Sequence, residues 1–114
     1  MNILVTGGAG YIGSATAEAL LEAGHSVTVY DSLVTGHRAA VPEAARFIHA
    51  DLGDDGALAR ALDAGKFEAV MHFAAFIEAG ESMKDPGRFF KNNFANSAGL
   101  IEAAVRAGVE RFVL

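Results

Sequence analysis

The sequence predicts an α/β fold in which a doubly wound parallel sheet is flanked by helices. Short runs rich in β-branched residues alternate with longer helical patterns along the 114 residues. The loops between them are short, which favours parallel strands joined by helical crossovers. A glycine-rich turn stands between the first strand-like run and the first helical pattern. We expect the strand order 3-2-1-4-5, truncated at the fifth strand, with a crevice between strands 1 and 4 where the order reverses.

Five segments have the apolar character of buried strands. The first, residues 2–6, is nearly continuous in apolar residues and leads directly into glycines. The others are predicted at residues 26–30, 46–50, 69–73 and 111–114.

Two shorter helices are predicted from periodicity and end signals. Residues 12–23 repeat apolar side chains at the spacing of one helix face, and Gly24 is predicted to end this helix. Asp54 and Asp55 stand where negative charge favours a helix start, and that helix is predicted to stop just before Gly65.

A longer helix is predicted at about residues 86–107. Pro86 suits its first turn and Gly108 its end. We expect one stripe of side chains along it, formed by Phe90, Asn93, Phe94, Ser97, Ile101, Ala104 and Val105.

Composition and charge exclude several classes of protein. With 52% hydrophobic and 20% charged residues, the chain fits a globular core rather than a disordered segment. A net charge of -5 and scattered basic residues argue against a nucleic-acid partner. The chain has no Cys, its four histidines show no metal-ligand spacing, and no apolar run is long enough to span a bilayer. No secretory signal is visible, so we expect a cytoplasmic protein without metal or membrane partners.

The glycine-rich turn has the spacing G-x-x-G-x-x-G through Gly7, Gly10 and Gly13. Gly7 permits a tight turn, Gly10 lets backbone amides approach a pyrophosphate, and Gly13 lets the helix pack closely on the sheet. The unpaired N–H groups and the dipole at the start of the helix attract phosphate charge. The turn therefore predicts a pyrophosphate site.

Asp31 ends the second strand, 18 residues after Gly13. A carboxylate there can accept both ribose hydroxyls of an adenosine and would repel the 2′-phosphate of NADP, so NAD is the predicted cofactor. Strand, turn, helix and acid in this order predict a Rossmann-type NAD-binding domain over residues 1–114. The alternative is a flexible glycine loop beside a solvated Asp31.

Three further positions can be interpreted in two ways. Asp51 follows the third strand and either meets the adenine edge or is an ordinary acid at a helix N-terminus. The small residues after Phe73, at the end of the fourth strand, either let the backbone run along the cofactor or serve close packing. Asn92 and Asn93 either hold a cofactor group or are structural.

These segments resemble the extended short-chain dehydrogenase/reductase family, and within it most closely the UDP-glucose 4-epimerases. The resemblance covers essentially the whole chain. Its most specific parts are Val5–Ser14 and Asp31–Gly36, and His72–Ala75, Gly80–Pro86 and Lys91–Asn93 add to it.

The resemblance implies cofactor contacts along the whole crevice. The pyrophosphate would contact the glycine turn and the start of the first helix, at Gly7, Gly10, Tyr11, Ile12 and Gly13. The adenosine ribose would contact Asp31, Ser32, Leu33, Val34, Thr35 and Gly36, and the adenine would contact Asp51 and Leu52. The rest of the cofactor would lie along Phe73, Ala74, Ala75, Phe76, Ile77 and Asn92. The sequence departs from the family pattern at Ile77, where Lys is common, and at Ala15, where His is common.

The family's chemistry uses a Ser or Thr and a Tyr-x-x-x-Lys pair. Its Tyr removes the proton of the sugar 4-hydroxyl as hydride passes to NAD. Tyr11 and Tyr30 are the only tyrosines, and neither has Lys four residues later, so no catalytic residue is assigned. We expect an incomplete domain, the N-terminal portion of an epimerase that lacks the substrate domain and is inactive alone.

The resemblance implies that the intact enzyme interconverts UDP-glucose and UDP-galactose by transient oxidation at C4, with a UDP-hexose as substrate. Three alternative functions remain open. The chain could belong to another nucleotide-sugar epimerase or dehydratase, it could be a non-catalytic NAD-binding module, or it could be a folded remnant that binds nothing. A bare edge strand and an uncovered helix face favour self-association, and the resemblance implies a homodimer.

Overall fold

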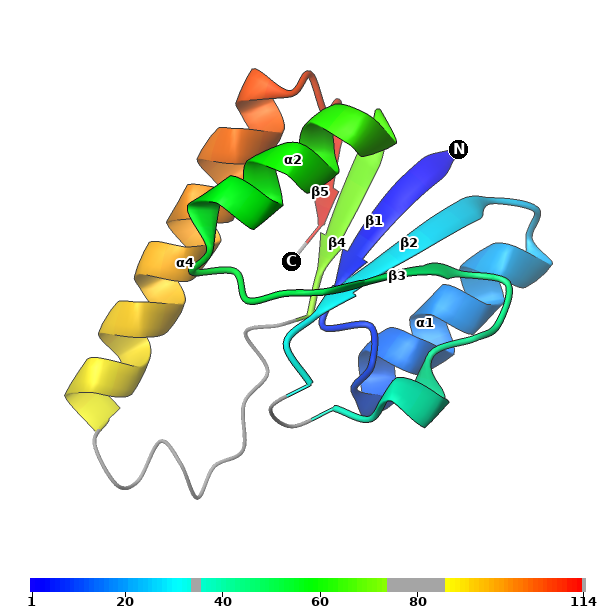
Figure 1. Cartoon of the computed structure of the whole chain (residues 1–114), viewed down its shortest axis with the longest axis horizontal. Helices are drawn as coiled ribbons and strands as arrows, with labels where there is room; N and C mark the ends of the chain where they lie inside the picture. The colour runs from blue at the N-terminus through cyan, green and yellow to red at the C-terminus, as the bar shows by residue number, and fades with distance from the viewer. Residues whose placement is uncertain (34–35, 74–85, 114) are drawn as a thin grey trace.

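The structure, a computed structural model, describes residues 1–33, 36–73 and 86–113, without the side chains of residues 86 and 88–93. It contains a five-stranded parallel sheet with the order β3-β2-β1-β4-β5 (Figure 1). The strands are β1 (Asn2–Thr6), β2 (Ser26–Asp31), β3 (Arg46–His49), β4 (Ala69–His72) and β5 (Arg111–Val113). The predicted fold class and strand order are confirmed.

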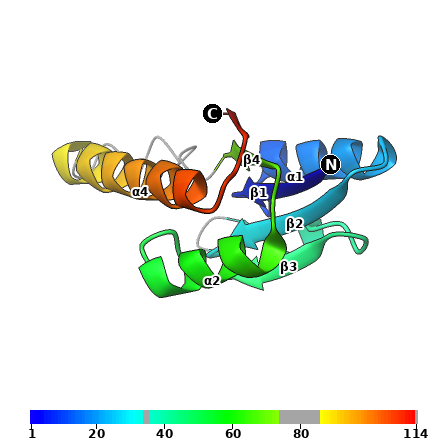
Figure 2. The same ribbon diagram turned by 90° about the horizontal axis from the view of Figure 1, so that it is seen from above.

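Helices cover both faces of the sheet (Figure 2). On one face, α1 (Tyr11–Glu22) packs over Ile3 and Val5 of β1. On the other, α2 (Asp55–Gly65) and α4 (Pro86–Arg106) pack over a cluster that includes Leu4. Because successive strand residues point to opposite faces, β1 supplies both cores, and its central residues 3–5 are all apolar. A short 3-10 helix, η1 (Arg38–Ala40), lies between β2 and β3.

The glycine after α1 reverses the chain as predicted. Gly24 has φ of 91°, a conformation that glycine adopts without steric cost. Its N–H donates to the carbonyl of Leu21 at 3.0 Å, and the N–H of His25 donates to the carbonyl of Leu20 at 3.1 Å. These two bonds form a Schellman motif that satisfies the last carbonyls of the helix.

The predicted end of α2 is wrong by one residue. Gly65 is the last helical residue, and Lys66 takes the left-handed conformation with φ of 52°. A Cβ at Gly65 would overlap the ring of Phe67, which is buried in the core. Glycine is therefore needed at this position to admit the Phe67 ring and not to reverse the chain.

The single stripe predicted along α4 is also wrong. The side facing the core is centred on Leu100 and Ala104, which are almost fully buried. Phe94, Ile101 and Val105 belong to another side of the helix and are 77%, 39% and 69% exposed. Helical periodicity shows that apolar sides exist, but the packing of α4 on α2 and β4 decides which of them is covered. No helix in the described part of the chain is both long and apolar enough to cross a membrane.

Candidate cofactor-binding site

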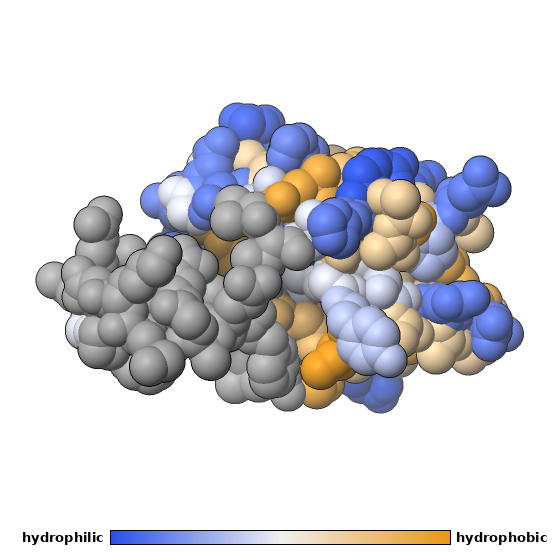
Figure 3. Space-filling model, turned by 90° about the horizontal axis from the view of Figure 1, so that it is seen from below, coloured by the Kyte–Doolittle hydropathy of each residue, from blue (hydrophilic) through white to orange (hydrophobic). Residues whose placement is uncertain are grey.

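The candidate site lies at the edge where the parallel strands end. All carboxyl ends meet at this edge, and α1 begins there (Figure 1). Thr6 at the end of β1 pairs with Tyr30 of β2 on one side and with His72 of β4 on the other. The chain leaves β1 toward β2 and crosses back to β4, so this point is the topological switch of the sheet. Figure 3 looks onto this edge, where polar and apolar residues mix over its described part.

The glycine turn is tied to the end of the neighbouring strand. Gly7 has φ of 74°, which a side chain would strain. Its N–H donates to the carbonyl of Tyr30 at 2.9 Å, and its own carbonyl accepts from the N–H of Gly10 at 3.2 Å. The turn is therefore a fixed structure with defined amide directions.

Two glycines in this turn permit close packing. A Cβ at Gly13 would overlap the carbonyl oxygen of Gly7, so α1 can approach β1 only because position 13 has no side chain. Gly8, which the sequence analysis did not single out, would place its Cβ 2.6 Å from the side chain of Val29. At Gly10 the nearest described atom would lie 3.5 Å from a Cβ, which is ordinary contact. Folding does not require glycine at position 10, so the predicted reason for it, close approach of a phosphate, stays a prediction.

The start of α1 has the character of an anion site. Tyr11, Ile12 and Gly13 occupy the first turn, whose N–H groups have no acceptor within the helix. The N-cap residue, Gly10, offers no side-chain oxygen to cap them, and the first turn holds no acidic residue. The positive end of the helix dipole is therefore neither capped nor neutralised by this turn.

Asp31 joins the end of β2 to the glycine turn. Its Oδ2 accepts from the N–H of Ala9 at 2.9 Å, and its Oδ1 accepts from the N–H of Leu33 at 2.8 Å. A solvated Asp31 beside a flexible loop does not fit these two bonds. Each carboxylate oxygen has a second lone pair, so the group can also accept ribose hydroxyls. The link to Ala9 is a structural role that the sequence did not reveal.

The chain after Asp31 returns onto the glycine turn. Leu33 has φ of 62°, uncommon for a branched residue and a feature found at ligand sites. The carbonyl of Ser32 accepts from Nε2 of His49 at 2.9 Å. The N–H of His37 donates to the carbonyl of Ala9 at 3.1 Å, and a Cβ at Gly36 would lie 2.8 Å from the carbonyl carbon of Ala9. The predicted ribose segment is therefore anchored at both described ends.

Asp51 is not the residue that caps α2. The N-cap is Asp54, whose Oδ1 accepts from the N–H of Ala57 at 3.0 Å. Oδ1 of Asp51 accepts instead from the N–H of Gly53 at 2.7 Å, which closes a tight turn before the helix. The interpretation of Asp51 as an ordinary N-terminal helix acid is wrong. Leu52 packs against the core beneath α2 and α4.

The other wall of the crevice contains a buried histidine. His72 is 2% exposed, and its Nδ1 and Nε2 lie 2.6 Å and 2.8 Å from the hydroxyl oxygens of Thr6 and Ser97. Burial lowers the pKa of His72, because a charged ring would lose its hydration. The N–H of Phe73 donates to the carbonyl of Thr6 at 2.8 Å. The sequence patterns assign no role to His72, although a histidine that ends an otherwise apolar strand is a signal of a buried polar contact.

Some predicted site residues fall outside the described part of the chain. These are Val34, Thr35, Ala74, Ala75, Phe76 and Ile77, together with the side chains of Asn92 and Asn93. The side chain of Phe90, predicted on the stripe of α4, also falls outside it.

A profile of the NAD dependent epimerase/dehydratase family matches residues 3–114. The chain belongs to this family. The match includes both strands that flank the switch point and the whole glycine turn, so the candidate site lies within the family domain.

Curated relatives and solved structures agree with the family assignment. The UDP-glucose 4-epimerase of Lacticaseibacillus casei is 46% identical over 113 residues, which are 99% of this chain and 34% of that enzyme. A probable UDP-arabinose 4-epimerase of Arabidopsis thaliana is 42% identical over 98% of this chain and 29% of its own length. The structure of the Thermus thermophilus UDP-glucose 4-epimerase in complex with NAD is 40% identical, with a TM-score of 0.92 over 98% of this chain and 36% of that one. The chain thus spans about a third of the length of the curated relatives.

Proposed function

We propose that this chain is the NAD-binding part of a UDP-glucose 4-epimerase, which interconverts UDP-glucose and UDP-galactose by transient oxidation at C4. One observation carries the proposal. Asp31 at the end of β2 holds Ala9 of the glycine turn at 2.9 Å, so a carboxylate suited to ribose lies beside the uncapped start of α1. The names of the relatives support the choice of reaction.

The residues of the candidate site fit a dinucleotide, and this fit supports NAD as the cofactor. The first-turn amides of Tyr11 and Ile12 would donate to the pyrophosphate, and Asp31 would accept from the ribose hydroxyls. The carboxylate of Asp51 and the backbone of Leu52 would hold the adenine. We assign the remaining contacts to Ser32, Leu33, Val34, Thr35, Gly36, Phe73, Ala74, Ala75, Phe76, Ile77 and Asn92, together with the glycines at 7, 10 and 13.

The proposed domain, residues 1–114, orients the cofactor and does not carry the proton transfer. When bound, NAD would supply the hydride acceptor and donor for the sugar. Neither tyrosine of the chain precedes a lysine by four residues, so the sequence holds no Tyr-x-x-x-Lys pair to abstract the 4-hydroxyl proton. We expect no turnover from this chain by itself, and a cytoplasmic location stays a prediction.

The identity of the sugar is a separate question. One relative is a probable UDP-arabinose 4-epimerase, so a nucleotide sugar other than UDP-glucose is the second candidate for the same site.

We also propose a homodimer formed through α4. Phe94, Ile101 and Val105 leave an apolar surface exposed on this helix, and such a surface is commonly covered by a partner. Sedimentation of the wild type against Phe94→Asp tests this proposal. A monomeric wild type at high concentration would overturn it.

Calorimetric titration with NAD and with NADP tests the cofactor site. We expect the wild type to prefer NAD, and Asp31→Ala to bind NAD at least about tenfold more weakly, because charge-assisted hydrogen bonds contribute about 1.5–3 kcal/mol each. The preference over NADP should shrink in the same variant. A wild type that binds neither dinucleotide would overturn the proposal. A coupled assay with UDP-galactose separates a catalytic chain from one that only binds.

A further inference from the structure

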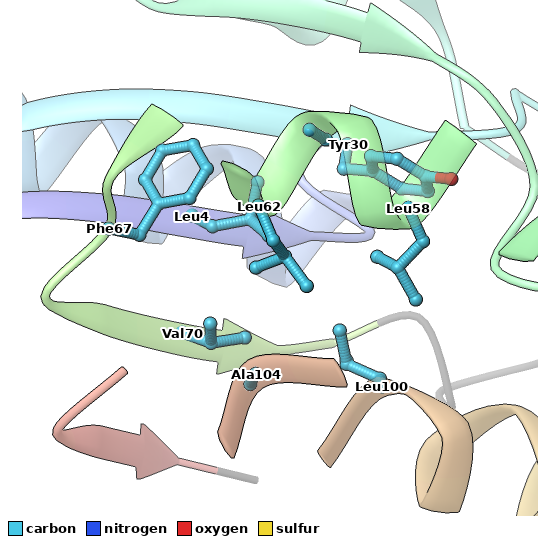
Figure 4. Packing of buried hydrophobic residues seen from close by; sticks show 9 residues of the cluster. Leu4, Tyr30, Leu58, Leu62, Phe67, Val70, Leu100 and Ala104 are labelled. Atoms are coloured by element: carbon cyan, nitrogen blue, oxygen red, sulfur yellow. The ribbon is translucent and has the colours of Figure 1, made fainter. Parts of the chain in front are cut away.

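Tyr30 connects the core of the protein to the turn that follows β3. Its ring packs in the cluster beneath α2 with Leu58 and Leu62, and the residue is 1% exposed. Figure 4 shows the ring above Leu58, with the hydroxyl pointing away from the Phe67 end of the cluster. That hydroxyl donates to the carbonyl oxygen of Asp51 at 2.8 Å. A buried side chain of β2 thus holds the main chain of the predicted adenine contact.

The turn around Asp51 has further hydrogen bonds of its own. The same carbonyl accepts from the N–H of Asp54 at 3.1 Å, and Oδ1 of Asp51 accepts from the N–H of Gly53 at 2.7 Å. These bonds close the turn but join only residues within it. The N–H of Ala50 donates to the carbonyl of Asp31 at 3.2 Å, a backbone bond that does not depend on side chains. The hydrogen bond from the Tyr30 hydroxyl is therefore a side-chain contact that links the closed turn to the sheet.

The hydroxyl is well suited to act as a permanent donor. Burial and, to a lesser extent, the charges of Asp54 and Asp51 raise the pKa of Tyr30 to about 12. The phenol therefore stays protonated at every pH at which the protein would work, and the carbonyl of Asp51 can only accept.

We propose that Tyr30 is a specificity-determining positioning residue for the adenine end of the site. By holding the carbonyl of Asp51, it orients the Asp51 carboxylate to accept from the exocyclic amino group of adenine. This inference rests on the proposed function. Hypoxanthine carries a carbonyl oxygen in place of that amino group, and two acceptors facing each other repel. Tyr30 would therefore increase the preference of the site for NAD over its hypoxanthine analogue without contacting either dinucleotide.

The test compares the affinities of Tyr30→Phe and wild type for NAD and for nicotinamide hypoxanthine dinucleotide by calorimetry. Phenylalanine keeps the ring in the core and removes only the hydroxyl. We expect the wild type to prefer NAD, and the preference to fall by about threefold to tenfold in the variant, the range for the loss of one hydrogen bond. Asp51→Asn should abolish most of the preference, because an amide can donate to the hypoxanthine oxygen.

Leu62→Val is the control, because Leu62 belongs to the same cluster and its aliphatic side chain cannot form a hydrogen bond to Asp51. We expect it to lower the melting temperature and to leave the ratio of the two affinities unchanged. The inference is overturned if Tyr30→Phe keeps the full ratio, if Leu62→Val reduces the ratio equally, or if Asp51→Asn keeps the ratio. An unchanged ratio in Asp51→Asn overturns the inference even if Tyr30→Phe does not fold.

The same titrations distinguish failure of the inference from failure of the proposed function. A wild type that binds neither dinucleotide overturns both. Binding of NAD without preference over the hypoxanthine analogue overturns the role of Asp51 and Tyr30, while the NAD site itself stands.

Discussion

The hydroxyl oxygen of Thr6 lies 2.6 Å from Nδ1 of His72, so side chains as well as backbone bonds join the ends of β1 and β4. On the other side of the ring, Nε2 lies 2.8 Å from the hydroxyl of Ser97 in α4. A neutral imidazole donates from one nitrogen and accepts at the other, and a hydroxyl can complement either role. This chain of three side chains connects the start of the glycine turn to α4 through the switch point of the sheet.

Removing either hydroxyl should destabilise the protein. Thr6→Val leaves a buried nitrogen of His72 without a partner, and we expect a loss of about 1–3 kcal/mol in the free energy of unfolding, measured with urea. Ser97→Ala should act in the same direction. Thr16→Val is the control, because the hydroxyl of Thr16, a half-buried residue, makes a solvent-exposed hydrogen bond to the carbonyl of Ile12 within α1. Equal stability of Thr6→Val and Thr16→Val would contradict a structural role for the His72 bonds.

The stability of the fold should depend on pH through His72. Burial lowers the pKa of His72 in the folded protein, so below the ordinary histidine value of about 6.5 the unfolded chain binds the proton more readily. The stability from the neutral ring is complete above that pH and is lost as the pH falls toward the lower pKa of the folded state. We expect the free energy of unfolding to decrease between pH 7.5 and 5.5.

Two variants separate His72 from the other histidines in that experiment. His72→Gln should show a smaller decrease with falling pH, since the buried titrating group is gone. His37→Gln removes an exposed ring near the same site and should keep the wild-type pH dependence. An unchanged pH dependence in His72→Gln would mean that another group titrates.

Adding one methyl group at Gly13 should disrupt the turn. A Cβ there would overlap the carbonyl oxygen of Gly7, so Gly13→Ala must push α1 away from β1. We expect destabilisation of about 1–3 kcal/mol, the usual range for overpacking, and weaker NAD binding. Gly99→Ala is the matched change within a helix, because its Cβ would meet no described atom within 4 Å. That variant should gain up to about 1 kcal/mol, and a loss in both variants would point to a general effect of glycine replacement.

Loss of the cap on α2 should lower stability by about 1 kcal/mol. In Asp54→Ala the N–H of Ala57 loses its side-chain acceptor, and thermal or urea unfolding measures the change. Asp63→Ala removes an exposed acid from the other end of the same helix. A carboxylate there opposes the helix dipole, so its removal should be neutral or slightly stabilising. Equal losses in the two variants would contradict a specific capping role for Asp54.

Much of the architecture could be predicted from local patterns. The apolar strand runs, the helical periodicity and the glycine turn are each encoded within about a dozen neighbouring residues, and the structure confirms the resulting fold class and strand order. The glycine spacing also located the turn, because left-handed φ at Gly7 and close packing at Gly13 allow few other residues. These features follow from the steric properties of short segments.

Only the tertiary structure decided which distant residues meet. Asp31 bonds to Ala9 across 22 positions, Tyr30 to Asp51 across 21, and Thr6 to His72 across 66. Such pairs form when the crossovers bring strand ends to one edge, and no local periodicity records them. The covered side of α4 was settled in the same way, since Leu100 is buried only because α2 and β4 lie against it. The sequence by itself determined the elements and their order, whereas the contacts that shape the site depended on how those elements pack.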